Sequence, residues 1–153
     1  MVNTDACDIS WQMIQEDSRL LALKLAKYRY KGIIAIARGG LIPAGLLACE
    51  LDIHLVDTLC LSSYDKDQQG QISVLKSLNH DGEGYLVIDD LSDTGNTFVV
   101  ARKILPKAHF ACLYVKPQGQ DKVDVFIRSF EQSMWLNFPW DGVQDYIPTA
   151  ENR

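Results

Sequence analysis

The stretch Val87–Thr97 has the sequence VIDDLSDTGNT, and it decides how the rest of the chain is interpreted. Its beginning overlaps the segment Tyr85–Asp90. The apolar residues of this segment predict a buried strand, and the two aspartates lie at the carboxyl end of that strand. A turn of small and hydroxylated residues follows, and Thr97–Leu105 then predicts a helix that ends before Pro106. A buried strand that leads through a glycine turn into a helix is the building unit of parallel α/β sheets.

The rest of the chain repeats this alternation. Apolar runs predict further strands over three segments, residues 32–37, 55–61 and 110–115. An apolar stripe from Trp11 to Tyr28 predicts an N-terminal helix with Ser10 as its N-cap, and Pro43 suits the first turn of a second helix. We therefore expect an α/β fold with a mostly parallel sheet flanked by helices, as a single domain over residues 1–153.

Composition limits the partners and the compartment. The 153 residues carry 20 acidic and 15 basic side chains, a net charge of −5, which argues against nucleic acid as a partner. None of the cysteines forms a C-x-x-C pair, so we expect buried thiols in a reducing compartment: Cys7, Cys49, Cys60 and Cys112. Acidic residues near the N-terminus argue against a signal peptide. We expect a cytoplasmic protein, with peripheral contact at the inner membrane as a second option.

The turn after the aspartates suits a phosphate group. Residues Thr94–Thr97 offer backbone N–H groups and hydroxyls where the expected helix begins, and the helix dipole favours an anion there. Gly95 permits a close backbone approach. The pair Asp89 and Asp90 suits neutral hydroxyls or a metal ion instead. Ribose 5-phosphate, with a phosphate at one end and a diol in the middle, satisfies both halves of the motif.

Ligands of such sheets bind beyond the carboxyl ends of the strands. The residues expected at three of these ends are Arg38–Gly40, the pair Asp89 and Asp90, and Lys116. The topology therefore predicts that glycine-turn, acidic and basic groups gather along one edge of the sheet.

The stretch VIDDLSDTGNT resembles the phosphoribosyl-pyrophosphate binding motif of the type I phosphoribosyltransferases. Nearly the whole chain is similar to the bacterial xanthine-guanine phosphoribosyltransferases of that family. The similarity rests on RGGLIP at 38–43, DTLCLSSYD at 57–65, DGEG at 81–84, PKAHF at 106–110, KP at 116–117 and PWD at 139–141. The acidic motif marks the superfamily, whereas Lys116 and Trp135 narrow the match to enzymes of 6-oxopurines.

The resemblance implies a type I phosphoribosyltransferase fold. Its parts would be a mobile lid loop at residues 62–76 and a small base-binding hood at about residues 117–153. It also implies an enzyme of purine salvage that uses Mg²⁺. Such an enzyme moves the 5-phosphoribosyl group from phosphoribosyl pyrophosphate to N9 of guanine, xanthine or hypoxanthine, giving GMP, XMP or IMP and pyrophosphate. The family further implies a homotetramer.

The resemblance also implies a role for each matching residue on the sugar side. Arg38 and Gly39 would hold the pyrophosphate, and Asp89 and Asp90 the ribose hydroxyls, with Asp90 as the metal ligand. The phosphoribosyl pyrophosphate site would be completed by the turn residues Asp93, Thr94, Gly95, Asn96 and Thr97.

On the base side, Asp93 would accept the proton of purine N7 as the catalytic residue. Lys116 would donate to O6, Trp135 would stack on the ring, and the main chain at Leu136 would meet the C2 edge. Three positions depart from the family pattern. Gly70 stands where relatives carry a lid arginine, Ser92 where an apolar residue is common, and Asn96 where glycine is frequent. Lys66 is a candidate substitute for the arginine.

Other interpretations compete with this one. Taken alone, an aspartate pair is more often a solvated turn, and Lys116 a surface lysine. A receiver-type phosphoacceptor would need its aspartate pair on the first strand, and a haloacid dehalogenase phosphatase would need D-x-D, so both motifs fail. The serious alternative is a regulator that keeps the fold, senses nucleotides without turnover and binds RNA or DNA.

Overall fold

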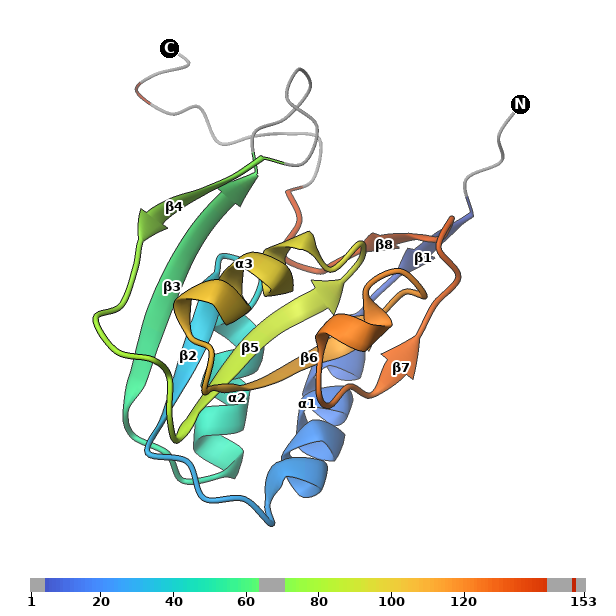
Figure 1. The fold of residues 1–153 in the computed structure, drawn as a ribbon. Coiled ribbons are helices and arrows are strands. Elements are labelled where there is room, and N and C mark those ends of the chain that lie inside the picture. The colour runs from blue at the N-terminus through green and yellow to red at the C-terminus, as the bar shows by residue number, and fades with distance from the viewer. Residues whose placement is uncertain (1–4, 64–70, 143–149, 151–153) are drawn as a thin grey trace.

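The computed structural model describes residues 5–63, 71–142 and 150. Helices and strands alternate along most of this part (Figure 1). In chain order they are β1 (Ala6–Asp8), α1 (Trp11–Leu25), β2 (Gly32–Ala37), α2 (Leu41–Glu50), β3 (Val56–Ser63), β4 (Ile72–Lys76), β5 (Tyr85–Ser92), α3 (Asn96–Ile104), β6 (His109–Val115), the short 3₁₀ helix η1 (Gln120–Lys122), β7 (Arg128–Ser129) and β8 (Trp135–Asn137).

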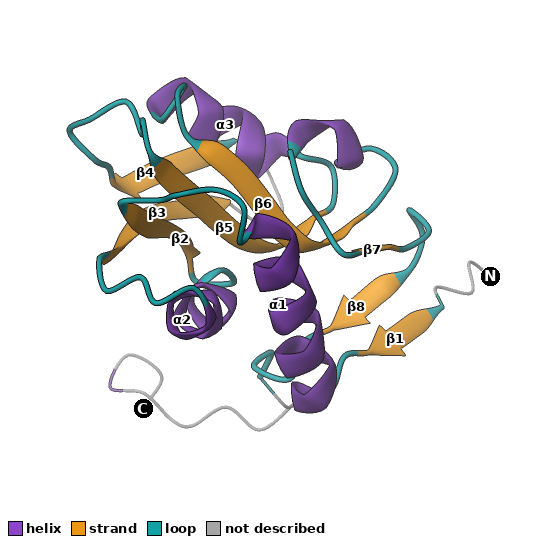
Figure 2. Cartoon of the chain, turned by 90° about the horizontal axis from the view of Figure 1, so that it is seen from below, coloured by secondary structure: helices purple, strands orange, loops and turns teal. Residues whose placement is uncertain are grey.

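The main sheet has six strands in the order β4-β3-β2-β5-β6-β7. All neighbouring strands are parallel except β3 and β4, which are antiparallel. Helices α1 and α2 cover one face of this sheet, and α3 covers the other (Figure 2). The expected α/β fold with a mostly parallel, helix-flanked sheet is confirmed, and it brings the carboxyl ends of β2, β3, β5 and β6 to one edge.

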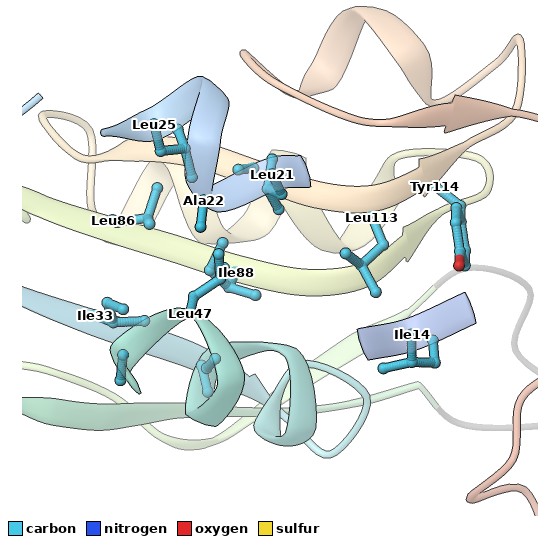
Figure 3. Packing of buried hydrophobic residues seen from close by; sticks show 14 of the residues in the cluster. Ile14, Leu21, Ala22, Leu25, Ile33, Leu47, Leu86, Ile88, Leu113 and Tyr114 are labelled. Atoms are coloured by element: carbon cyan, nitrogen blue, oxygen red, sulfur yellow. The ribbon is translucent and has the colours of Figure 1, made fainter. Parts of the chain in front are cut away.

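Apolar side chains fill both faces of the sheet. On the α1 and α2 face, Leu21, Leu47 and Ile88 belong to one buried cluster (Figure 3). On the α3 face, Phe98 packs edge-on against Phe110, with ring centroids 6.2 Å apart. Because the central strands are buried on both sides, they are continuous apolar runs, which is what made them visible in the sequence.

Helix α1 begins as expected but ends early. The Ser10 hydroxyl accepts a hydrogen bond from the Met13 N–H at 3.1 Å, which confirms the N-cap. The helix ends at Leu25, and Tyr28 lies beyond it with its ring against His109, the centroids 4.7 Å apart.

A second sheet has two strands, one near the beginning of the described part and one near residue 136. Strand β1 pairs in parallel with β8, and Cys7 lies opposite Leu136. This small sheet lies beside the main one (Figure 2). It gives the expected hood an N-terminal strand that the sequence patterns did not reveal.

Two expectations need correction. The segment 62–76 is not a loop at its ends, because Ser62 and Ser63 extend β3 and residues 72–76 form β4. Residues 64–70, with Gly70 and Lys66, lie outside the described part. The thiols are not uniformly buried either. Cys49 is exposed, whereas Cys112 is buried, and burial raises its pKa.

Candidate functional site

A cavity of about 1350 Å³ opens at the carboxyl ends of β2, β3 and β5. Its polar lining includes five of the residues expected in the site: Arg38, Gly39, Asp89, Asp90 and Thr97. Apolar side chains of Phe138 and Trp140 line the same cavity from the segment after β8. The sheet thus gathers part of the predicted sugar and pyrophosphate set around one cavity, as expected for strand ends in a parallel sheet, whereas residues 93–96 of the turn are not part of its lining.

The turn between β2 and α2 needs its two glycines. A Cβ atom on Gly39 would lie 2.5 Å from a carboxylate oxygen of Asp90, and one on Gly40 would lie 2.3 Å from the Ile88 carbonyl oxygen. The peptide bond between Ala37 and Arg38 is cis. The turn therefore places its backbone directly against the acidic pair, an approach that a side chain would block.

The acidic pair is held by backbone hydrogen bonds at the wall of the cavity. One oxygen of Asp89 accepts the Asp90 N–H at 2.8 Å, and one oxygen of Asp90 accepts the Leu91 N–H at 2.7 Å. Burial raises the pKa of Asp89 well above its ordinary value, and the charge of Asp90 adds to that rise. Burial also raises the pKa of Asp90. Two carboxylates in this position favour a proton or a cation beside them.

The turn into α3 leaves its helix N-terminus free of acidic side chains. Gly95 has a φ of +86°, and a Cβ atom there would lie 2.3 Å from the Lys122 side chain. Thr94 uses its hydroxyl to accept the Asn96 N–H at 3.5 Å. The first turn of α3 carries no carboxylate. The backbone N–H groups of this turn can therefore receive an anion.

Beyond this turn, Asp93 is held by two side chains. The Lys116 ammonium donates to its Oδ2 at 2.9 Å, and the Gln132 amide donates to its Oδ1 at 2.7 Å. The Lys116 side chain is only 5% exposed, whereas that of Asp93 is 46% exposed. The interpretation of Lys116 as a surface lysine is therefore wrong, and its charge lies against the residue expected to accept a proton.

The hood presents an aromatic ring and an open strand edge. Trp135 is 62% exposed, and its indole N–H donates to the Asn137 side chain at 2.9 Å. The backbone N–H of Trp135 donates to the Asp5 carbonyl oxygen, and the Asn137 carbonyl oxygen accepts the backbone N–H of Ile9. Since backbone groups alternate in direction along a strand, the N–H and C=O of Leu136 point away from β1.

The structure brings some predicted residues together and keeps others apart. Asp93 and Lys116 touch each other, whereas Trp135 and Leu136 lie on a separate small sheet. Gln132 was not predicted, because a lone glutamine before a tryptophan matches no motif. Ser92, at a position where relatives are often apolar, is buried, and its hydroxyl donates to the Gly119 carbonyl oxygen at 2.8 Å.

Comparison with known proteins shows the family of the chain. Residues 10–145 match the phosphoribosyl transferase domain family. A xanthine-guanine phosphoribosyltransferase of Desulfotalea psychrophila is 53% identical over 135 residues, which are 87% of this chain and 84% of that protein. One of Nitratidesulfovibrio vulgaris is 48% identical over 147 residues, which are 95% of this chain and 90% of that protein.

A solved structure extends the match to the fold. The purine phosphoribosyltransferase of Pyrococcus horikoshii superposes with a TM-score of 0.79 at 28% identity, covering 94% of this chain and 99% of that one. The family model spans most of the chain, and it includes the acidic pair, the turn into α3 and Lys116. The chain therefore belongs to the phosphoribosyl transferase family.

Proposed function

We propose that the chain transfers the 5-phosphoribosyl group of phosphoribosyl pyrophosphate to N9 of a 6-oxopurine in purine salvage. The observation that carries this proposal is the pairing of Asp93 with the buried ammonium of Lys116, three residues along the chain from Asp90, which lines the cavity together with Asp89. An acceptor beside a donor matches the N7–H and O6 of a 6-oxopurine. Two bacterial relatives at about 50% identity carry the name xanthine-guanine phosphoribosyltransferase.

The sugar substrate fits the cavity in one direction. Its 5′-phosphate would lie in the turn Asp93–Thr97, which leads into a first turn of α3 without acidic side chains. Its ribose hydroxyls would meet Asp89 and Asp90, and its pyrophosphate would lie at Arg38 and Gly39. This order follows the sequence of groups along the molecule, from phosphate through diol to pyrophosphate.

The residues also fit Mg²⁺. Among the described residues, no group of three or more His, Cys, Asp or Glu side chains could hold a metal ion. Mg²⁺ is usually held by one or two carboxylates, with waters and substrate phosphates completing its shell. Asp90 would hold the ion, and Asp89 lies beside it. When bound there, Mg²⁺ would neutralise charge on the departing pyrophosphate.

Asp93 would handle the proton of the reaction. The bond between C1′ and the pyrophosphate oxygen breaks, its electron pair leaves with the pyrophosphate, and purine N9 forms the new bond to C1′. The proton on N7 then passes to Asp93 Oδ2, which keeps the base neutral. A positioned base of this kind typically contributes about 10²–10⁴-fold to the rate.

Recognition of the base would come from three directions. The Lys116 ammonium suits the 6-oxo acceptor and opposes the 6-amino group of adenine. The exposed Trp135 offers a face for stacking, and the open backbone of Leu136 can meet the C2 edge. Guanine, xanthine and hypoxanthine differ at C2, so the main-chain groups that contact the C2 edge would determine which of these bases is preferred.

The proposal includes a cytoplasmic homotetramer, which the family resemblance implies. Apolar side chains on the outside of the described part offer contact area, and Leu23 is 68% exposed. None of the described helices is long and apolar enough to cross a membrane. Light scattering coupled to gel filtration would give the mass of the assembly.

A turnover assay tests the function. With Mg²⁺ and phosphoribosyl pyrophosphate, we expect nucleotide from guanine, xanthine and hypoxanthine, and none from adenine. No turnover with any base, together with tight binding of phosphoribosyl pyrophosphate and salt-dependent binding of RNA or DNA, would favour the regulator instead.

A further inference from the structure

Gln132 links three segments that approach the base side of the site. Its amide nitrogen donates to Asp93 Oδ1 at 2.7 Å and lies 3.4 Å from the Asp93 carbonyl oxygen. Its amide oxygen accepts the Gln118 N–H at 2.9 Å. The Gln132 side chain thus joins the turn after β5 to the turn after β6. Gln132 itself lies in the hood, three residues before Trp135.

The contacts of Gln132 fix which way its amide points. A reversed amide would place its oxygen against the Asp93 carboxylate and its NH₂ group against the Gln118 N–H, so both contacts would become repulsive. The amide nitrogen must therefore face Asp93. Gln132 is partly buried, so water competes less for its hydrogen bonds than it would at an exposed side chain.

Lys116 and Gln132 hold different oxygens of the same carboxylate. In the described residues, these are the side chains that donate to Asp93, with Lys116 on Oδ2 and Gln132 on Oδ1. If Lys116 turns to the purine O6, as the proposed function requires, Oδ2 becomes free for the N7 proton. Gln132 can stay on Oδ1, because neither of its contacts uses a group that the base needs.

We propose that Gln132 is a positioning residue that fixes Asp93 for proton acceptance while Lys116 binds the base. The inference rests on the proposed function, since it assigns a support to the proton acceptor of that reaction. The amide is a neutral donor, so it orients the carboxylate without placing a second positive charge beside it. Lys116 is in this arrangement the displaceable partner of Asp93.

A double-mutant cycle separates this role from simple bracing of the hood. The variant Gln132→Met keeps the length of the side chain and removes both hydrogen bonds. It would be compared with Asp93→Ala, in which no carboxylate is left to orient, and with the double variant. The matched control is Gln120→Met, which makes the same exchange at an exposed position of η1.

We expect Gln132→Met to lower kcat with guanine roughly tenfold or more, as a part of the 10²–10⁴-fold that a positioned base contributes. The KM for phosphoribosyl pyrophosphate and the melting temperature should change little, and Gln120→Met should match the parent. In the Asp93→Ala background, Gln132→Met should cause almost no further loss.

Two outcomes would overturn the role of Gln132. One is a parent rate in Gln132→Met, and the other is an equal loss with and without Asp93, which would make Gln132 a brace that acts independently. Absence of turnover in the parent chain with every base would overturn the proposed function, and the positioning role with it. A parent chain that turns over while the cycle shows no coupling overturns the positioning role alone.

Discussion

Arg128 on β7 donates two hydrogen bonds, each 2.8 Å long, to the carboxylate of Asp17, which is fully buried in α1. The Tyr114 hydroxyl donates to the same carboxylate at 2.7 Å. The two charged residues are 111 positions apart in the chain. They connect the N-terminal helix to the last strand of the main sheet, next to the segment that carries Gln132 and Trp135.

Removal of Arg128 should destabilise the fold. The variant Arg128→Ala leaves the buried Asp17 carboxylate with only the Tyr114 hydroxyl as its side-chain partner among the described contacts, so a buried charge loses its counter-ion. Because half of the Arg128 side chain is exposed, we expect a loss of roughly 3 kcal/mol, the low end for a broken buried pair. Urea unfolding followed by circular dichroism would measure it.

The matched control is Lys107→Ala. Lys107 pairs with Asp81 at 3.4 Å, but the two side chains are 60% and 46% exposed. A surface pair of this kind is worth about 0–1 kcal/mol. Equal losses in the two variants would mean that the burial of Asp17 adds nothing to the strength of its pair.

The acidic pair should make stability depend on pH. Burial raises the pKa of Asp89, so the folded chain keeps this proton to a higher pH than the unfolded chain does. The free energy of unfolding should therefore fall as pH rises from the ordinary value, about 3.9, through the raised one. Asp89→Asn should remove this fall and raise stability at pH 8 by about 1–2 kcal/mol, while it lowers turnover.

Thermal melts of the ligand-free protein between pH 5 and pH 8 would test this, with a rising advantage of Asp89→Asn toward pH 8. Asp57→Asn is the control whose effect should be constant over this pH range. A hydrogen bond from Lys76 lowers the pKa of Asp57, so the stabilisation by this carboxylate is fully present between pH 5 and pH 8 and is lost only at lower pH, as pH falls through that lowered value. An Asp89→Asn advantage that is the same at both pH values would contradict the burial argument.

Loss of the proton acceptor should act mainly on chemistry. Asp93→Asn keeps the size of the side chain and an acceptor for the Lys116 ammonium, but it gives up the hydrogen bond from Gln132, and the amide cannot take the N7 proton. We expect kcat to fall by about 10²-fold or more with little change in the melting temperature. An unchanged single-turnover rate would remove Asp93 from the mechanism.

Loss of the exposed indole should weaken binding of the base. Trp135→Ala removes the stacking face and leaves the backbone pairing of β8 with β1 in place. We expect the KM for guanine to rise roughly tenfold, since stacking of a base on an aromatic ring is worth about 1–3 kcal/mol. The KM for phosphoribosyl pyrophosphate should change less, and equal rises of both constants would show that Trp135 only packs.

The sequence predicted those elements whose burial imposes a pattern. The expected strand over residues 32–37 coincides with β2, because this strand is buried on both faces and nearly every residue in it is apolar. Strand β4 was missed because it is an edge strand with Val74 and Leu75 largely exposed, so it lacks a hydrophobic alternation. Strands β1 and β8 have three residues each, which is too short for any periodicity.

The site residues also fall into two groups, those that local sequence predicts and those that depend on contacts between distant positions. Asp89, Asp90 and the turn to Thr97 form one continuous motif, so local spacing was sufficient to predict them. The contacts of Gln132 with Asp93 and of Arg128 with Asp17 join positions 39 and 111 residues apart. No local rule links such positions, and only the folded chain shows them. Lys116 was placed at the correct strand end, but its burial depends on the turns around it.

The pairing of β1 with β8 also has a consequence for synthesis of the protein on the ribosome. The strands from β2 to β6 and the acidic motif are complete once residue 115 has emerged, whereas β8 ends at Asn137. The first strand must therefore wait, unpaired, for almost the entire chain before it finds its partner. A nascent chain that stalls between these points can carry the proposed sugar-binding half of the site, but it lacks the strand proposed to contact the base.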